Sequence, residues 1–245
     1  MPSAIATEGL QVTFGAKVAL DDLTLDVPAG TSLAVIGPNG SGKSTLLGAL
    51  AGTLAPSAGT VRVVGKAPAL VLQQTDVDKS LPITVRDTVS MARYSTLKLF
   101  GRFRNGDGDA VERAARRLDI TDLMDRQLHE LSGGQRQRVL VAQGIAQDTD
   151  VLLLDEPVTG LDATSREVIL ELIDEEVDRG RTVVVTTHDF DDAQRCEQVL
   201  LLDTRPVAVG PPPEVLVEAN LRQAFGGRFV RVGDEFLLDD PHHRH

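Results

Sequence analysis

The sequence is short of cysteine, of aromatic residues and of basic residues to balance its acidic ones. A single cysteine, Cys196, cannot form a disulfide within the chain, which favours a reducing compartment. The net charge of -11 excludes the basic footprint typical of nucleic-acid-binding proteins, so we expect no nucleic-acid partner. No stretch approaches the roughly 20 apolar residues that span a bilayer, and the N-terminus lacks a basic segment followed by an apolar one. These shortages predict a cytoplasmic protein that acts on a membrane only through another subunit.

Hydrophobic residues make up 42% of the chain, enough for one sizeable core of mainly aliphatic side chains. Alternating apolar residues predict half-buried strands over residues 4–14 and 20–27. Short apolar runs predict further strands, over residues 33–36, 61–64, 69–72, 151–154 and 182–187. Helices are predicted over residues 44–52 and 165–179. Strands that alternate with helices indicate a parallel sheet with right-handed crossovers.

A helical period dominates residues 80–147 and separates two parts of this α/β pattern. Within it, residues 110–118 have strong helix propensity, and a polar, glycine-containing break is predicted over residues 105–109. Residues 93–117 carry seven basic and three acidic side chains in an otherwise acidic protein. That charge fits either a solvated helix face or a docking surface for a partner.

Residues 37–44 (GPNGSGKS) match the phosphate-loop pattern G-x-x-x-x-G-K-[ST] between a predicted strand and a predicted helix. Its glycines let successive backbone N–H groups surround phosphate oxygens, and the helix N-terminus faces the same anion. Lys43 supplies a positive charge for the β- and γ-phosphates, and Ser44 supplies a hydroxyl for Mg²⁺. The predicted phosphate-binding residues are Gly37, Pro38, Asn39, Gly40, Ser41, Gly42, Lys43, Ser44 and Thr45.

Two acidic residues and a histidine follow predicted core strands. Asp155 is predicted to bind Mg²⁺ through its water shell, and Glu156 to polarise the attacking water as general base. His188 follows the strand over residues 182–187, and strand ends in such a sheet face the ligand crevice. We expect His188 to contact the γ-phosphate and to hold Glu156 and the water in line. A helix cap for the two acids and a structural role for the histidine are the alternatives.

The heptad LSGGQRQ at residues 131–137 lies between the phosphate loop and the Asp155–Glu156 pair. Ser132 is a predicted N-cap and hydroxyl donor, and Gly133 and Gly134 allow close backbone approach before a helix that continues from Gln135. The start of this helix is thus a second site suited to a phosphate, besides the phosphate loop. The phosphate loop already binds the ATP of the same chain, so the second site is left for another ATP. We therefore predict that Ser132 contacts the γ-phosphate held by a second subunit.

Together these motifs resemble the nucleotide-binding subunit of the ATP-binding cassette family over residues 5–227. The resemblance implies an α/β fold: a RecA-like P-loop NTPase core with a mostly parallel sheet, an antiparallel β subdomain and an inserted α-helical subdomain. It places the nucleotide-binding domain at residues 4–227, the helical subdomain at 80–147, and a short polar tail at 228–245. It also implies an ATPase that uses ATP and Mg²⁺ and forms a head-to-tail homodimer when ATP is bound. Its implied partners are integral membrane permease subunits, at the cytoplasmic face of the membrane, and an extracytoplasmic substrate-binding protein.

Three further residues take their roles from the resemblance alone. Phe14 corresponds to the aromatic residue that stacks on adenine, a position more often occupied by tyrosine. Gln73 corresponds to the glutamine that joins Mg²⁺ and senses the permease, and Asp162 lies in the loop that crosses the dimer seam. The sequence departs from the family at Leu72, where proline is common, and at residues 142–144 (AQG), where Ala-Arg-Ala is common. The missing arginine removes a positive charge near the helix that begins in the heptad of residues 131–137.

A narrower resemblance concerns residues 77–87, 207–212 and 221–227, which are similar to manganese, zinc and iron uptake ATPases. It implies an importer of a metal ion, with zinc or manganese as cargo. Import of haem or an iron chelate, and a soluble family member without a permease, remain the alternatives. The chain ends with His242, His243 and His245, which either bind Zn²⁺ weakly without function or form a metal site.

Overall fold

Within the part of the chain that the structure describes, the main sheet has six strands in the order β5-β6-β7-β3-β8-β9. The computed structural model describes residues 2–73, 82–94, 105–226, 229–232 and 235–238. The strands are β3 (Ser32–Ile36), β5 (Ala69–Val71), β6 (Val151–Asp155), β7 (Thr182–Thr187), β8 (Gln198–Asp203) and β9 (Arg205–Gly210). All neighbours pair in parallel except β9, which is antiparallel to β8. The predicted α/β fold with a mostly parallel sheet is confirmed.

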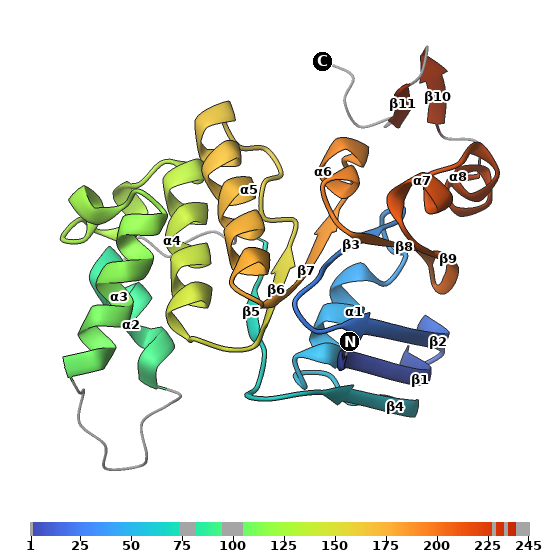
Figure 1. The fold of residues 1–245 in the computed structure, drawn as a ribbon, viewed down its shortest axis with the longest axis horizontal. Helices are drawn as coiled ribbons and strands as arrows, with labels where there is room; N and C mark the ends of the chain where they lie inside the picture. Colours follow the sequence, from blue (N-terminus) through green and yellow to red (C-terminus); the bar gives the residue numbers. More distant parts are fainter. Residues whose placement is uncertain (1, 74–81, 95–104, 227–228, 233–234, 239–245) are drawn as a thin grey trace.

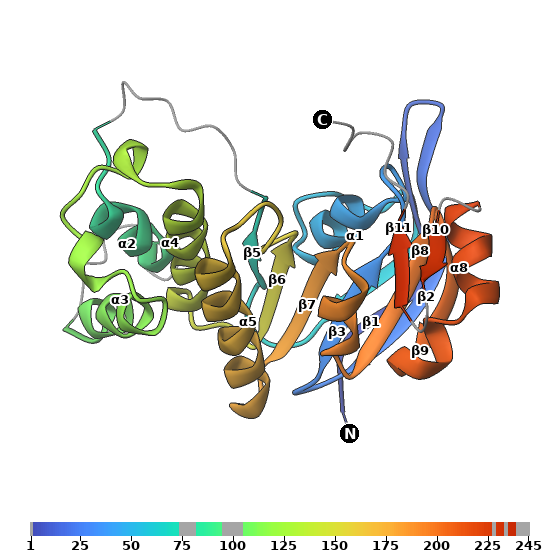
Figure 2. The same ribbon diagram turned by 90° about the horizontal axis from the view of Figure 1, so that it is seen from above.

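Alternate side chains of the central strands enter two separate cores. Leu33 and Val35 of β3 pack into a cluster with helix α1 (Lys43–Leu50), whereas Ala34 and Ile36 point into the other cluster. This second cluster takes in the helices on the opposite face, which are α5 (Ala163–Asp178), α6 (Phe190–Gln194), α7 (Pro212–Val215) and α8 (Glu218–Phe225). Figures 1 and 2 show α1 and α5 on opposite faces of the sheet. Every residue of β3, β6 and β7 is buried, as expected for strands covered on both faces.

A smaller antiparallel sheet lies beside α1 (Figure 1), with strand order β2-β1-β4. Its strands are β1 (Ser3–Phe14), β2 (Lys17–Pro28) and β4 (Ala58–Val63). Leu10, Leu20 and Leu23 are fully buried and join the cluster that contains α1. The alternation that predicted half-buried strands therefore reflects one face packed on the core and one face toward solvent.

In the described residues between β5 and β6, three helices form the helical insert: α2 (Val85–Tyr94), α3 (Asn105–Arg117) and α4 (Gly133–Ala146). Two short 3₁₀ turns, Thr121–Leu123 and Leu128–Glu130, connect α3 to α4. The predicted break over residues 105–109 is wrong, because these residues form the first turns of α3. Asp107 there pairs with Arg93 at 2.8 Å, and an acidic residue also complements the helix N-terminus. These interactions offset the low helix propensity of Gly106 and Gly108.

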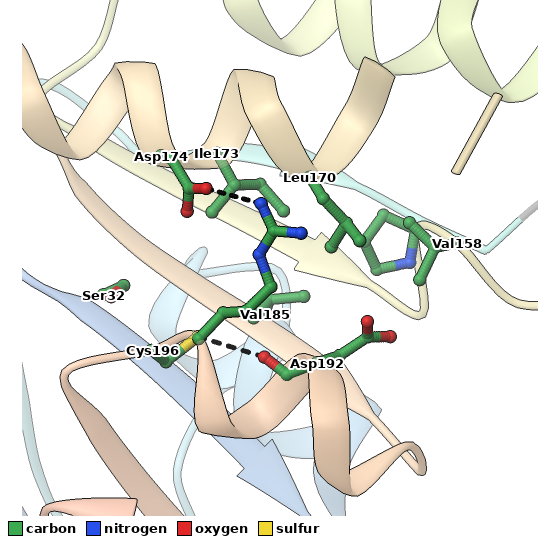
Figure 3. Close-up of a pocket in the computed structure, with 10 residues that line it drawn as sticks. Ser32, Val158, Leu170, Ile173, Asp174, Val185, Asp192 and Cys196 are labelled. Atoms are coloured by element: carbon green, nitrogen blue, oxygen red, sulfur yellow. Dashed lines mark hydrogen bonds and ion pairs between the residues drawn. The ribbon is translucent and has the colours of Figure 1, made fainter. Parts of the chain in front are cut away.

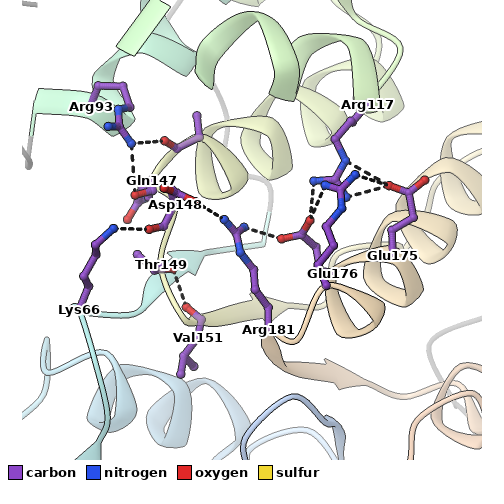
Figure 4. A network of polar contacts seen from close by, with 12 residues as sticks. Lys66, Arg93, Arg117, Gln147, Asp148, Thr149, Val151, Glu175, Glu176 and Arg181 are labelled. Carbon is purple, nitrogen blue, oxygen red and sulfur yellow. Dashed lines mark hydrogen bonds and ion pairs between the residues drawn. The ribbon is translucent and has the colours of Figure 1, made fainter. Parts of the chain in front are cut away.

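A buried carboxylate joins the helical insert to the main sheet (Figure 4). Glu176 of α5 has a side chain only 1% exposed and forms ion pairs with Arg117, Arg179 and Arg181. Arg117 ends α3 and also contacts Glu175 at 2.8 Å, while Arg181 precedes β7 and also contacts Asp148 at 2.8 Å. We call these six residues the Glu176 network. It connects α3, α5 and the loop after α4, with the buried carboxylate of Glu176 at its centre.

The chain continues with regular structure beyond α8. Strands β10 (Phe229–Val232) and β11 (Glu235–Leu238) form an antiparallel hairpin, with Phe229 opposite Leu238. The sequence prediction for this part was only a short polar tail, without the strands that the segments FVRV and EFLL form. The terminal histidines, and residues 77–81 of the segment similar to metal-uptake ATPases, lie outside the described residues.

Candidate functional site

Two glycines of the loop between β3 and α1, Gly37 and Gly42, lie so close to neighbouring backbone that no side chain would fit there. A Cβ on Gly37 would lie 1.9 Å from the carbonyl oxygen of Leu202 in β8. Gly42 caps α1 with φ 104°, and a Cβ there would lie 2.5 Å from the carbonyl oxygen of Ala19 in β2. The loop therefore depends on glycine at both positions, through space at Gly37 and through space and backbone conformation at Gly42.

The polar side chains of this loop suit an anion. Lys43 is 6% exposed, and its Nζ donates hydrogen bonds to the carbonyl oxygens of Gly37 at 2.8 Å and Pro38 at 3.4 Å. Burial lowers the pKa of Lys43, and the nearby carboxylates of Glu156 and Asp155 oppose that shift. The Oγ of Ser41 is buried and has no hydrogen-bond partner among the described residues. An orphaned hydroxyl and a buried cation beside a helix N-terminus fit the phosphates of a nucleotide.

The side chain of Glu156 lies at the centre of a polar cluster built from three strand ends. Its Oε2 accepts hydrogen bonds from Gln73 Nε2, which follows β5, and from Thr159 Oγ1, both at 3.3 Å. His188 Nδ1, after β7, lies 3.7 Å from the same oxygen. The contact with His188 lowers the pKa of Glu156, and Glu156 in turn raises the pKa of His188. The structure thus brings Gln73, Glu156 and His188 together. The strand ends predicted this for Glu156 and His188, whereas only the family resemblance pointed to Gln73.

Thr186, the residue that sequence reasoning missed, connects the two acids. Its Oγ1 accepts a hydrogen bond from the backbone N–H of Glu156 at 2.8 Å and donates one to Asp155 Oδ1 at 2.6 Å. Glu156 itself has φ 46°, an uncommon conformation for a residue with a side chain. The only signal in the sequence is a pair of threonines at the end of β7, directly before His188.

Hydrogen bonds and ion pairs at the start of α6 stabilise the loop after β7. Asp189 caps α6 by accepting from the N–H groups of Asp191 and Asp192, and its own N–H donates to Thr187 Oγ1 at 3.0 Å. Arg166 of α5 reaches both Asp189, at 3.2 Å, and Asp192, at 2.5 Å. These contacts fix the backbone on the C-terminal side of His188, whose side chain stays half-exposed and accessible from solvent.

The oxygen donors around the loop suit Mg²⁺. This cation usually takes one or two carboxylates together with phosphate oxygens and water. Asp155 is buried at the end of β6, Ser44 lies in the first turn of α1, and Gln73 directs its amide nitrogen to Glu156. The carbonyl oxygen of Gln73 is the atom of that side chain able to join a cation. The three residues therefore fit the predicted metal role.

Phe14 lies at the turn of the β1–β2 hairpin, opposite Lys17, and is 51% exposed. The same hairpin contributes Ala19 and Leu20, which lie against Gly42 of the phosphate loop. An exposed aromatic ring on an element that touches the loop is placed where it could stack on a nucleotide base.

The heptad of residues 131–137 begins α4. Ser132 is the N-cap: its Oγ accepts from the N–H of Gln135 at 3.3 Å, and Gln135 Oε1 accepts from the N–H of Ser132 at 3.0 Å. Gly134 packs on the start of α5, where a Cβ would lie 2.4 Å from Ser165 Oγ and 2.6 Å from Asp162 Oδ2. Asp162 in turn caps α5 through the N–H of Ser165. The heptad of residues 131–137 and the loop at Asp162, which was predicted to cross the dimer interface, thus pack together as one unit.

This unit is separate from the phosphate loop of the same chain. Figures 1 and 2 both show β5 and β6 between α4 and α1. The structure therefore does not place Ser132 or Asp162 in the cluster around Lys43 and Glu156. This arrangement agrees with a role for Ser132 at a nucleotide held elsewhere.

A small cavity between α5, α6 and β7 contains none of the predicted site residues (Figure 3). It is lined by Leu170, Ile173, Asp192, Arg195 and Cys196, among others. Burial raises the pKa of the Cys196 thiol to about 12, so this side chain stays neutral and packs as an apolar group. Cys196 lies just after α6, outside the helix.

Comparison with known proteins identifies the family. Residues 20–159, more than half of the chain, match the ABC transporter family. The chain belongs to this family. It is therefore an ATP-binding cassette, an ATPase whose activity is coupled to transport. Among the described residues of this cassette, no helix has the length and apolar character needed to cross a bilayer.

Relatives of the cassette include ATP-binding subunits named for metal transport. It is 33% identical over 243 residues to the manganese transport system ATP-binding protein MntB of Bacillus subtilis, covering 96% of this chain and 97% of that protein. It is 36% identical over 233 residues to the zinc transport system ATP-binding protein TroB of Treponema pallidum, covering 92% and 88%. A solved ABC transporter described as of metal-chelate type, in an inward-facing conformation, is similar with a TM-score of 0.84 and 30% identity over 96% of each chain.

Proposed function

We propose that this cassette powers the uptake of a metal ion, zinc or manganese, through a separate membrane permease. The observation that carries the proposal is near full-length similarity to subunits named for manganese and zinc transport, at 33% and 36% identity. The similarity of residues 77–87 to metal-uptake ATPases supports the same cargo. Import of an iron chelate or haem is the nearest alternative, favoured by the metal-chelate type of the solved relative.

In this proposal the loop of residues 37–45 binds the phosphates of ATP, with Lys43 on the β- and γ-phosphates. Ser44, Gln73 and Asp155 would hold Mg²⁺, which when bound neutralises charge on the phosphates. Glu156 accepts the proton of the attacking water, for which its lowered pKa keeps it ionised at neutral pH. His188 orients Glu156 from 3.7 Å and contacts the γ-phosphate.

A homodimer completes the site. The helix N-terminus at Ser132 and the loop at Asp162 lie apart from the phosphate loop of their own chain, with β5 and β6 between α4 and α1, and Gly134 packs against Asp162. A second copy in head-to-tail orientation would bring Ser132, Gly133, Gly134 and Gln135 to the γ-phosphate that it holds. Closure around two ATP molecules and reopening after hydrolysis would move the permease subunits.

The permease and an extracytoplasmic substrate-binding protein are the proposed partners, with the cassette on the cytoplasmic face of the membrane. In this arrangement those partners choose the cargo, and the cassette supplies the work of ATP hydrolysis. A soluble assembly or repair factor without a permease is the alternative from a different class. Purification of the cassette with only soluble partners, and no polytopic membrane protein, would favour that alternative.

The decisive experiment replaces Glu156 by Gln in cells that carry the cognate permease. We expect hydrolysis to fall by orders of magnitude, ATP binding to persist, an ATP-bound dimer to accumulate, and uptake of labelled manganese and zinc to stop. Glu171→Gln, an exposed change on α5, is the matched control and should leave uptake unchanged. Unchanged metal uptake in Glu156→Gln would overturn the importer proposal. If Glu156→Gln stayed monomeric at saturating ATP, the proposal that two copies share each ATP site would be overturned.

A further inference from the structure

We infer that Thr186 is a positioning residue for ATP hydrolysis, which holds Asp155 and Glu156 in their working orientation through one hydroxyl. The inference rests on the roles proposed above for those two acids. Thr186 itself touches neither nucleotide nor metal in this scheme. It acts through Asp155 and Glu156 from the neighbouring strand.

The sheet places Thr186 directly beside the two acids. In the parallel pairing of β6 with β7, Asp155 lies opposite Thr186. The Thr186 side chain is fully buried, with 0% of the residue exposed, so water does not compete for its hydroxyl. That hydroxyl accepts from Glu156 N–H at 2.8 Å and donates to Asp155 Oδ1 at 2.6 Å. The two hydrogen bonds form at once, which fixes the rotation of the hydroxyl and holds Oδ1 of Asp155 toward Thr186.

Glu156 needs this support because its backbone leaves the regular strand. Its φ of 46° turns the chain out of β6, and its N–H donates to a side chain instead of to the backbone of a neighbouring strand. Thr186 Oγ1 is the acceptor that this N–H finds. Without the hydroxyl, a partly buried N–H loses its partner at the residue that carries the proposed base, and the left-handed conformation loses one of the contacts that maintain it.

The same strand supplies a matched control. Thr182, at the other end of β7, is 1% exposed, and its Oγ1 accepts from the backbone N–H of Gly30 at 2.9 Å. Thr182 and Thr186 therefore share residue type, strand, burial and a bond to a backbone N–H. They differ in that only Thr186 reaches the two acids.

The test compares Thr186→Val, Thr186→Ser and Thr182→Val. In the nucleotide-free protein, we expect Thr186→Val to accelerate amide hydrogen exchange at Glu156, and Thr182→Val to accelerate it at Gly30 instead. With MgATP, Thr186→Val should lower kcat by about 10–100-fold and raise the Mg²⁺ concentration needed for half-maximal ATP binding, as loss of a supporting contact to a metal ligand does. Thr186→Ser keeps the hydroxyl, so its kcat and its Mg²⁺ requirement for ATP binding should lie close to those of the wild type. Thr182→Val should retain the wild-type kcat.

The possible results distinguish a failure of the role inferred for Thr186 from a failure of the roles proposed for Asp155 and Glu156. If Glu156→Gln abolishes turnover while Thr186→Val behaves like Thr182→Val in exchange at Glu156 and in kcat, the role of Thr186 is refuted. If Glu156→Gln keeps wild-type turnover, the site assignment itself fails, whatever Thr186 does. Should Thr186→Val not fold, Thr186→Ala is compared with Thr186→Ser, and equal kcat values in that pair refute the inference in the same way.

Discussion

Replacing Glu176 by Gln would remove the single negative charge that Arg117, Arg179 and Arg181 share (Figure 4). Removal of one partner from a buried ion pair costs about 3–5 kcal/mol. Here the two better-buried arginines keep second acceptors, Glu175 for Arg117 and Asp148 for Arg181. Those contacts are more exposed and recover part of the loss, so we expect a decrease of about 2–3 kcal/mol in the free energy of unfolding.

Urea denaturation, followed by circular dichroism, measures this decrease directly. At roughly 2–4 °C per kcal/mol for a chain of this size, Tm should fall by about 4–12 °C. Glu171→Gln lies on the exposed side of the same helix and should stay within about 0.5 kcal/mol of the wild type. A loss for Glu176→Gln no larger than that of Glu171→Gln would refute the view that this buried carboxylate joins the helical insert to the sheet.

Other predictions address the site. Lys43→Ala removes a buried cation and should weaken ATP binding by about 10–100-fold, measured by calorimetry, since hydrogen bonds to charged groups are worth about 1.5–3 kcal/mol. Ser132→Ala removes the cap of α4 and should lower the free energy of unfolding by about 1 kcal/mol, visible in urea titrations. In NMR titrations, the pKa of His188 should lie above its ordinary value and fall in Glu156→Gln. The stabilisation from this contact is present below the ordinary histidine pKa and is lost as pH rises through the raised one. Equal His188 titration midpoints in the two proteins would contradict that assignment.

Residues that belong to short local patterns were predictable from the sequence. The phosphate loop depends on glycine spacing, and Asp155 and His188 follow apolar runs that end at one edge of a parallel sheet. The predicted N-cap at Ser132 is confirmed, and the structure adds a capping box with Gln135 that spans only four residues.

Residues whose roles depend on distant partners were not predictable. Thr186 meets Asp155 only because β6 and β7 are neighbours in the given register. The start of α3 at Asn105 was missed because the ion pair of Asp107 with Arg93 comes from another helix and outweighs local glycine propensity. Gln143, in place of the common arginine, lies next to Gly144. The lack of a side chain there admits Val71 of β5, since a Cβ would lie 2.5 Å from Val71 Cγ2.

The place of β3 in the sheet sets the order in which a growing chain can acquire its nucleotide site. The phosphate loop is synthesised early, but both neighbours of β3 come late, since Leu33 pairs with Val184 on one side and Gln198 on the other. Until those strands leave the ribosome, both edges of β3 expose unpaired backbone groups, and its distant contacts require closure of a long loop. A fragment that ends before residue 182 would contain every residue of the loop but neither of the strands that pair with β3. ATP can therefore act as a ligand of the finished domain, not as a template for its first half.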